Sequence, residues 1–377
     1  MIHWQKDTVP RTEWLDTLRI LASFLVILSH YAYFFLNTAQ HNFGYHMAGS
    51  TGRLGVALFF AISGYLACHS LDRIRYFTML AVGRFYYKKL VRILIPWWAA
   101  MFVMGGLVVV LSLMNRQFLQ ISTLAITIFA GVRYDKLFIS FFPLDVSLSS
   151  FFPWSGYFFI GEWFIGTVLW LYSLSPILYF AARRYSIGGL IATILISIVS
   201  CKLLYGQVSD GFCFFTARIP EFLLGMILFH QRNLFSQWKK AILPAAAGIV
   251  LLVGGYDTLH YTPGALWVES YLPLKPRSFF LSLPLIILFF YGMQWINKKG
   301  TLHRLNQFSK ISYVFMLIQH IMLFIFMNNM DYGRFSKFGI LFVFVVIVVC
   351  TAYVSLFIYS LYKPVETWLI DRGREKE

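Results

Sequence analysis

Residues 14–36 read WLDTLRILASFLVILSHYAYFFL, a long run that is apolar at most positions. About 20 such residues cross the hydrocarbon core of a bilayer as an α-helix. Arg19 and His30 lie eleven positions apart in this run, and at about 100° per residue their side chains point to the same side of the helix. About 16 Å of helix axis separates them, roughly half the thickness of the core. A permanent cation and a titratable base are costly in a membrane helix, so we interpret the pair as functional.

The composition places the whole chain in a membrane. Of its 377 residues, 59% are hydrophobic and only 13% are charged, which is outside the balance of a soluble globular protein. Apolar runs of about 17 to 25 residues recur from end to end, and their backbone groups must form hydrogen bonds within each segment. We therefore predict an all-α polytopic membrane protein with about ten transmembrane helices. The predicted spans are 14–36, 54–72, 92–113, 157–181, 186–204, 212–230, 241–256, 278–296, 311–329 and 338–362.

The net charge of +16 is explained by the topology in the membrane and not by a nucleic-acid-binding surface. With the N-terminus in the cytoplasm, most of the 32 basic residues fall on the inner side of these spans. An excess of Lys and Arg in cytoplasmic loops is the usual rule for membrane proteins. We therefore predict that the N- and C-termini are both cytoplasmic, and we expect no nucleic-acid partner.

No separate soluble domain is expected. The first apolar run is too long for a cleavable signal peptide, and no block of soluble composition occurs, so we predict a single transmembrane domain over residues 1–377. Residues 117–132 are apolar enough to be a rival span. We interpret them as an outer re-entrant or interfacial segment, because counting them would invert the charge bias downstream. The four cysteines lack metal-ligand spacing, so no metal is expected.

His30 is a candidate acid or base near neutral pH, and apolar surroundings favour its neutral form, which can accept a proton. A general base beside a hydroxyl acceptor is what acyl transfer requires. The alternative is a structural histidine that hydrogen-bonds to a neighbouring helix. The spacing alone leaves both interpretations open.

Arg19 also has two interpretations. Its guanidinium can bind an anionic ligand, or it can extend to the inner lipid headgroups near the start of the helix. Asp16 precedes it by three residues, so a helix-face ion pair can hold the guanidinium and lower its cost of insertion.

A basic cluster precedes the third predicted span. In residues 84–92, RFYYKKLVR, Lys88 and Arg92 are separated by one helical turn and share a face, with Lys89 beside them. Such a cluster can bind the phosphates of a cytoplasmic cofactor or rest on anionic lipid.

Other polar positions within the spans support either packing or chemistry. In residues 59–65, FFAISGY, Ser63 and Gly64 are small enough for another helix to approach closely, and Tyr65 follows them. Arg218 and Glu221 can pair at i, i+3, which reduces the cost of burying each. Glu162 has no obvious local partner and lies near the predicted outer mouth, and His320 follows Gln319 in the ninth span.

Five stretches in this order resemble the motifs of the acyltransferase 3 family of bacterial integral membrane acyltransferases. The first stretch resembles the family's opening motif, in which Asp is followed by Arg, and Arg is followed after ten residues by His. The second stretch resembles the family's Phe-Phe-x-x-Ser-Gly-Phe/Tyr element. The others resemble its basic loop ending in Pro, its Trp-centred span and its Arg…Glu-Phe-Leu-x-Gly element. They are Trp14–His30, Phe59–Tyr65, Arg84–Pro96, Glu162–Phe164 and Arg218–Gly225.

The resemblance implies a ten-span fold that moves an acyl group, usually acetyl, from cytoplasmic acyl-CoA to a sugar hydroxyl at the outer face. It maps the family's essential Arg and His onto Arg19 and His30. It also implies the single-domain type, without the extracytoplasmic esterase-like domain of some members. In the ninth span the family usually reads Tyr-Leu-x-His, whereas this chain has Gln319 at the His position and His320 one residue later, about 100° round the helix.

We thus expect an O-acyltransferase, in particular an O-acetyltransferase, in a bacterial cytoplasmic (inner) membrane. Its partners would be acyl-CoA, a surface glycan or lipid-linked glycan, and membrane lipid; a homo-oligomer stays open. His30, Arg19 and Glu162 are the expected catalytic residues, and Arg19 with the Lys88, Lys89 and Arg92 cluster would hold the donor. Asp16, Ser63, Tyr65, Arg218 and Glu221 would support the site. The alternatives are a glycan transporter or exporter with charged residues along its path, and a sensor without chemistry.

Overall fold

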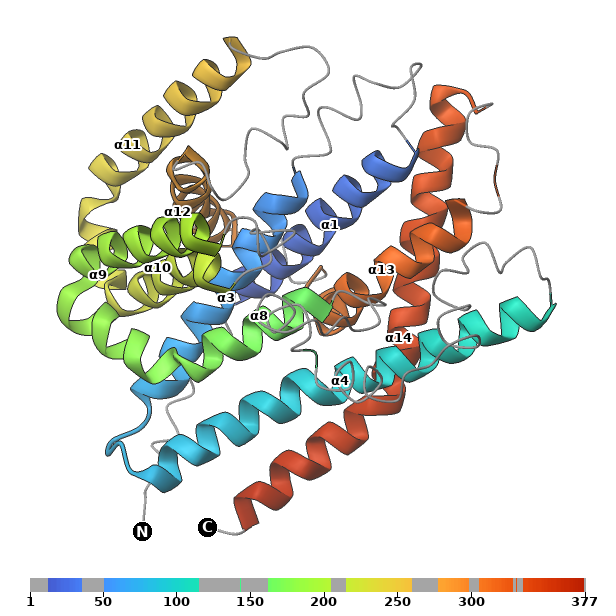
Figure 1. The fold of residues 1–377 in the computed structure, drawn as a ribbon, viewed down its shortest axis with the longest axis horizontal. Coiled ribbons are helices and arrows are strands. Elements are labelled where there is room, and N and C mark those ends of the chain that lie inside the picture. Colours follow the sequence, from blue (N-terminus) through green and yellow to red (C-terminus); the bar gives the residue numbers. More distant parts are fainter. Residues whose placement is uncertain are drawn as a thin grey trace. The chain divides into compact units, whose positions relative to one another are not determined.

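Helices make up the described part of the chain in the computed structural model (Figure 1). The structure describes residues 13–35, 51–114, 143, 162–204, 215–259, 277–297, 305–327, 330 and 335–375, and no strand occurs among them. The α-helices are α1 (Glu13–Phe35), α3 (Thr51–Asp72), α4 (Met79–Met114), α8 (Glu162–Ser173), α9 (Ser175–Leu204), α10 (Ile219–His230), α11 (Arg232–Leu259), α12 (Arg277–Asn297), α13 (Ser312–Met327) and α14 (Lys337–Glu375). Two short 3-10 helices, η3 (Phe215–Arg218) and η5 (Leu305–Lys310), precede α10 and α13. The predicted outer segment 117–132 lies outside the described residues.

The helices have the length and composition of membrane spans. Among the described residues, five are long and apolar enough to cross a bilayer, within α1, α3, α4, α9 and α14. Shorter apolar helices occupy Trp163–Ser173, Leu281–Asn297 and Ser312–Met327. These findings confirm an all-α membrane protein. The count of ten spans and the side on which each terminus lies stay predictions.

Three helices extend well beyond their predicted bounds: α4, α11 and α14. Helix α11 runs from Arg232 to Leu259, whereas its span was predicted at 241–256. The third span is predicted at 92–113, but α4 begins at Met79, so the helix already includes the basic cluster of residues 84–92. The Thr78 hydroxyl caps its start by accepting a hydrogen bond from the Ala81 N–H at 3.2 Å. Likewise α14 runs to Glu375 rather than ending at 362, and the Ser336 hydroxyl caps its first turn. Lys and Arg are good helix formers, so each helix continues where the hydropathy falls.

The predicted span 157–181 is interrupted after Ser173. Pro176 lacks a backbone N–H and cannot complete the helical ladder there, so α8 and α9 meet at Leu174. A second break lies inside α9 at Ser186, whose backbone has φ 21° and ψ −90°. The Ser186 hydroxyl donates to the Ala182 carbonyl at 2.8 Å and accepts from the Gln231 amide at 3.1 Å. This bend agrees with the predicted boundary between spans 157–181 and 186–204.

The chain packs as two compact units that interleave along the sequence. Unit 1 comprises residues 1–24, 53–86 and 167–309, and unit 2 comprises 25–52, 87–166 and 310–377. The division falls within five elements, each of which contributes residues to both units: α1, α3, α4, α8 and η5. The prediction of a single domain stays a prediction.

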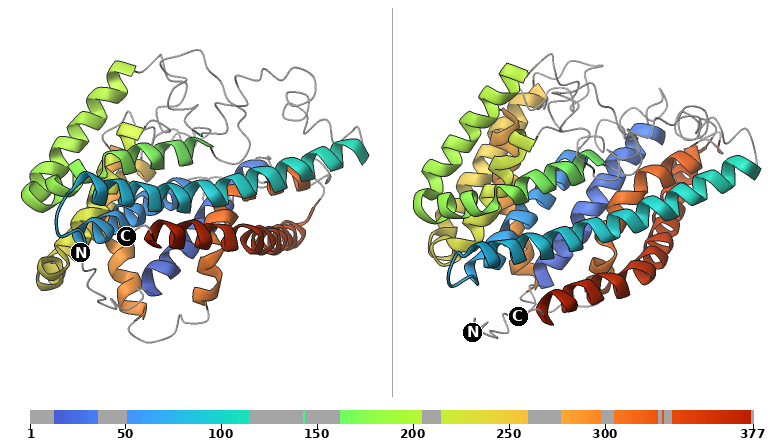
Figure 2. Two further views of the ribbon diagram at one scale, coloured as in Figure 1. Left: turned by 90° about the horizontal axis from the view of Figure 1, so that it is seen from below. Right: turned by 60° about the horizontal axis from the view of Figure 1, so that its bottom comes forward.

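Unit 1 is organised around aromatic side chains and paired helices. Helix α9 lies beside α10, and α11 lies beside α12, in all the views of Figures 1 and 2. The Tyr65 ring on α3 meets Trp14 of α1 at 5.5 Å and Phe229 of α10 at 5.1 Å, both edge-on, and Phe290 of α12 packs against Trp14 at 5.4 Å. Edge-to-face packing of this kind favours one arrangement of the four helices.

Helices α3 and α10 touch through two reciprocal glycines. A Cβ added to Gly64 would lie 1.9 Å from the Phe222 carbonyl oxygen, and one added to Gly225 would lie 1.9 Å from the Ala61 carbonyl oxygen. Backbone therefore meets backbone at this crossing, as small residues allow in membrane helices. The predicted packing role of Gly64 is confirmed.

Unit 2 has its own apolar core. Tyr31 and Phe35 of α1 stack at 4.7 Å, and the Tyr31 hydroxyl donates to the Ile340 carbonyl of α14 at 2.5 Å. Helix α13 lies beside α14, and the Tyr313 hydroxyl donates to the Ile93 carbonyl of α4 at 3.2 Å. At the other end of α14, the Tyr87 hydroxyl of α4 donates to the Leu369 carbonyl at 3.0 Å. The core residues are Ile27, Tyr31, Phe35, Phe315, Leu323, Ile340, Val343, Phe344 and Ile347.

The glycine contact yields a stability prediction. Gly64→Ala and Gly225→Ala each force two backbones apart, so each should lower the free energy of unfolding by about 1–3 kcal/mol or more. Thermal unfolding in detergent, followed by circular dichroism, measures the change. Gly248→Ala in α11 is the matched control, since nothing lies within 4 Å of its added Cβ and alanine favours the helix. Equal melting temperatures for Gly64→Ala and Gly248→Ala would contradict the proposed crossing.

Candidate active site

Helix α1 carries the two residues that the sequence singled out. It is continuous from Glu13 to Phe35, so the spacing of Arg19 and His30 is a helical spacing, as predicted. Arg19 belongs to unit 1 and His30 to unit 2.

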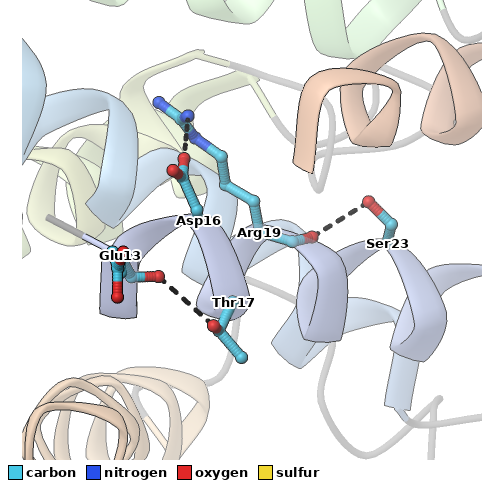
Figure 3. A network of polar contacts seen from close by, with 5 residues as sticks. All are labelled: Glu13, Asp16, Thr17, Arg19 and Ser23. Carbon is cyan, nitrogen blue, oxygen red and sulfur yellow. Dashed lines mark hydrogen bonds and ion pairs between the residues drawn. The ribbon is translucent and has the colours of Figure 1, made fainter. Parts of the chain in front are cut away.

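Arg19 forms the predicted ion pair with Asp16. Its Nη1 donates to Asp16 Oδ1 at 3.1 Å, and the side chains are 31% and 12% exposed (Figure 3). Around the pair, the Ser23 hydroxyl donates to the Arg19 carbonyl and the Thr17 hydroxyl to the Glu13 carbonyl. Acidic residues in the first turn also favour the positive end of the helix dipole. The carboxylate thus anchors the guanidinium while nearly a third of that side chain stays accessible to an anion.

Aromatic side chains of unit 1 pack against the first turn of α1. Trp14, two residues before Asp16, packs edge-on against Tyr65 and Phe290. Tyr65 is buried, whereas Ser63 is half-buried. Tyr65 is thereby placed to support the first turns of α1, the part that carries the Arg19–Asp16 pair.

His30 faces a second histidine. The rings of His30 on α1 and His320 on α13 lie 5.0 Å apart between centroids, tilted by 52°. Gln319, which is 1% exposed, lies beside the same His30 ring. The Nδ1 atom of His30 and the Oε1 atom of Gln319 are buried and have no hydrogen-bond partner among the described residues. Two histidines and a buried glutamine therefore lie together in unit 2.

Sequence reasoning gave His320 no role, because its position is one residue beyond the expected motif. The structure places both Gln319 and His320 next to His30 despite the 100° between them. The only signal in the sequence was a Gln-His pair within a strongly apolar run, which is costly enough to indicate use.

The three side chains of the basic cluster on α4 differ in their exposure. Lys88 is half-buried, Lys89 is buried at 8% exposure, and Arg92 is exposed. Lys88 and Arg92 are one helical turn apart, as expected, so these two can present charge together. Buried Lys89 is not part of that exposed face.

Glu162 begins α8, but its side chain lies outside the described residues. Its expected role beside His30 or the acceptor stays a prediction. Among the described residues, no group of three or more His, Cys, Asp or Glu side chains could hold a metal ion.

Arg218 and Glu221 form the predicted pair at the junction of η3 and α10. Arg218 Nη1 donates to Glu221 Oε1 at 3.0 Å and to Oε2 at 3.2 Å, and the side chains are only 7% and 3% exposed. The guanidinium also lies over the Phe60 ring at 5.7 Å. This pair lies between α10 and α3, close in sequence to their glycine crossing, which favours its structural interpretation.

A family model described as an acyltransferase domain matches residues 12–360, nearly the whole chain. The chain belongs to the acyltransferase 3 family. No curated protein and no solved structure matches it.

The five stretches that resemble this acyltransferase family fall on successive elements of the structure. They lie in α1, α3, α4, at the start of α8, and across η3 and α10. In unit 1, the second and fifth stretches meet directly at the glycine crossing. Part of the motif set is therefore a packing contact of the acyltransferase fold.

The Arg218–Glu221 pair yields a second stability prediction. Glu221→Ala leaves a buried guanidinium without its carboxylate, so it should lower the free energy of unfolding by about 3–5 kcal/mol. Thermal unfolding and the yield of monodisperse protein in detergent measure this loss. The control is Glu366→Ala, which removes the carboxylate from a pair whose Lys363 side chain is 42% exposed and should cost about 1 kcal/mol or less. Equal losses in the two variants would show that the buried pair is not structurally important.

Proposed function

We propose that this membrane acyltransferase is an O-acyltransferase, in particular an O-acetyltransferase, which transfers an acyl group from cytoplasmic acyl-CoA to a hydroxyl of a bacterial surface glycan. The family membership supports acyl transfer in general. The observation that carries the finer proposal is the continuous helix α1, with an anchored cation near its start and an imidazole eleven residues later. The acceptor can be the polysaccharide itself or a lipid-linked precursor.

The proposed topology has ten spans in a bacterial inner membrane, with both termini in the cytoplasm. The described helices lie over the predicted spans, and the basic residues on the inner side support this orientation. In this arrangement Arg19 lies near the cytoplasmic face and His30 beyond the middle of the bilayer. The 16 Å of axis between them, about half the hydrocarbon core, suits the extended arm of a coenzyme A thioester.

Each residue has a step in the proposed reaction. Arg19, with Lys88 and Arg92, binds donor phosphates by charge-assisted hydrogen bonds. His30 removes the proton of the acceptor hydroxyl while its oxygen attacks the thioester carbonyl. A C–O bond forms, the C–S bond breaks, and the departing thiolate receives a proton to leave as free coenzyme A. Glu162 would orient the acceptor or polarise His30.

The function is tested with purified protein in lipid nanodiscs, labelled acetyl-CoA and surface polysaccharide. We expect label in the polysaccharide, and mass spectrometry should show acylated glycan only in cells that have the gene. Glycan acylation that is unchanged without the gene, together with no transfer in vitro, would overturn the proposal. In that case, movement of unmodified glycan across the membrane of vesicles that contain the protein and the same lipids would indicate transport.

Replacing His30 should remove catalysis. His30→Gln keeps a polar side chain but no acid or base, so the rate of transfer should fall by about 10²–10⁴-fold. The initial rate with labelled acetyl-CoA measures the effect, and the amount of protein in the membrane fraction shows whether the variant folds. Full activity in a well-folded variant would end the proposed role of His30.

Replacing Arg19 should chiefly weaken donor binding. Loss of one charged hydrogen bond to phosphate costs about 1.5–3 kcal/mol, so Arg19→Gln should raise the KM for acyl-CoA by about 10- to 150-fold. The KM for the glycan acceptor, measured in parallel, should change little. An unchanged KM for acyl-CoA would remove Arg19 from the donor site.

A further inference from the structure

Two imidazole rings meet in unit 2, from helices far apart in the sequence. His30 on α1 and His320 on α13 are 5.0 Å apart between ring centroids. The rings are tilted by 52° to each other, so the two imidazoles are direct neighbours. Phe324, one turn after His320, packs edge-on against its ring at 4.9 Å.

The surroundings of the pair are apolar. Ile27 and Tyr31 flank His30 on α1, and Leu323 follows His320 on α13; all three belong to the core of unit 2. Two like charges at this distance repel strongly in such a medium, so at most one of the two imidazoles is an imidazolium cation at a time. Such a pair can pass a single proton between its members without creating a second charge.

Two buried polar atoms lie beside the histidine pair. His30 Nδ1 and Gln319 Oε1 have no well-aligned hydrogen bond among the described residues, although the two side chains are neighbours. A buried polar atom without a partner costs about 1–3 kcal/mol. A substrate hydroxyl at this place can donate its proton to His30 Nδ1.

We propose that His320 is the second imidazole of the reaction site and carries the proton that His30 takes from the acceptor hydroxyl to the departing thiolate. The inference rests on the proposed function. His30 gains the hydroxyl proton on one nitrogen and releases a proton from the other to His320. His320 then protonates the thiolate sulfur, and both imidazoles end neutral. Gln319 orients the hydroxyl beside His30.

The test compares three variants in the labelled acetyl-CoA assay. His320→Gln keeps a hydrogen-bonding amide but cannot carry a proton, so kcat should fall by about 10- to 100-fold while the KM values for donor and acceptor stay within about twofold. Imidazole added to the medium should restore part of the lost kcat. His320→Gln should also retain the wild-type melting temperature to within a few degrees.

Two controls separate proton transfer from packing. Phe324→Leu loosens a ring contact of His320 but keeps the imidazole, so its kcat should stay near that of the wild type. His69→Gln removes another histidine, which packs against Phe229 in unit 1, and should also leave kcat unchanged. A loss in Phe324→Leu equal to that in His320→Gln, with no rescue by imidazole, would assign His320 a packing role and overturn the inference.

The outcomes distinguish this inference from the proposed function. If the wild-type protein transfers no label, the proposed function fails and His320 has no reaction to serve. If the wild type and His320→Gln transfer label at equal rates while His30→Gln does not, the function and His30 stand and only the role of His320 is wrong.

Discussion

The structure depends on one constraint: inside an apolar helical protein, each polar side chain must be satisfied by the protein itself, because the hydrocarbon supplies no partner. Arg19 meets Asp16 within one helical turn, and Arg218 meets Glu221 in the same way. Both pairs are local, so they form together with their helices. His30 differs, because its companions come from α13 and one of its ring nitrogens has no partner among the described residues. The two arginines thus have carboxylate partners on their own helical turns, whereas the place where we propose chemistry is assembled from two helices.

The two units support the two ends of α1 by different means. In unit 1, edge-on aromatic contacts and a backbone crossing at Gly64 and Gly225 hold the helices around the Arg19 end. In unit 2, a stacked Tyr31 and Phe35 and the hydrogen bond from Tyr31 to α14 hold the His30 end. Rigid packing next to each polar group limits the orientations available to it, which is what positioning of a reactant requires.

The sequence alone predicted what depends on local pattern. Hydropathy placed the helices in the right order, and the i, i+3 spacing predicted both ion pairs. It failed at the ends of α4 and α14, because hydropathy marks the membrane core whereas helix propensity and the Thr78 and Ser336 caps mark the helix. It also failed for His320. Periodicity shows which face of a helix is polar but not which helix lies against that face. It therefore could not predict the contact between residues 30 and 320.

The hydrogen bond from Tyr87 to the Leu369 carbonyl joins the basic turn of α4 to the last turns of α14. Gly373 lies so close to the Tyr87 ring that a Cβ there would be 2.8 Å from it. One side chain therefore ties the start of α4 to the last turns of α14 within unit 2. A residue larger than glycine fits at position 373 only if the Tyr87 ring moves away, so this position limits how far the end of α14 can vary.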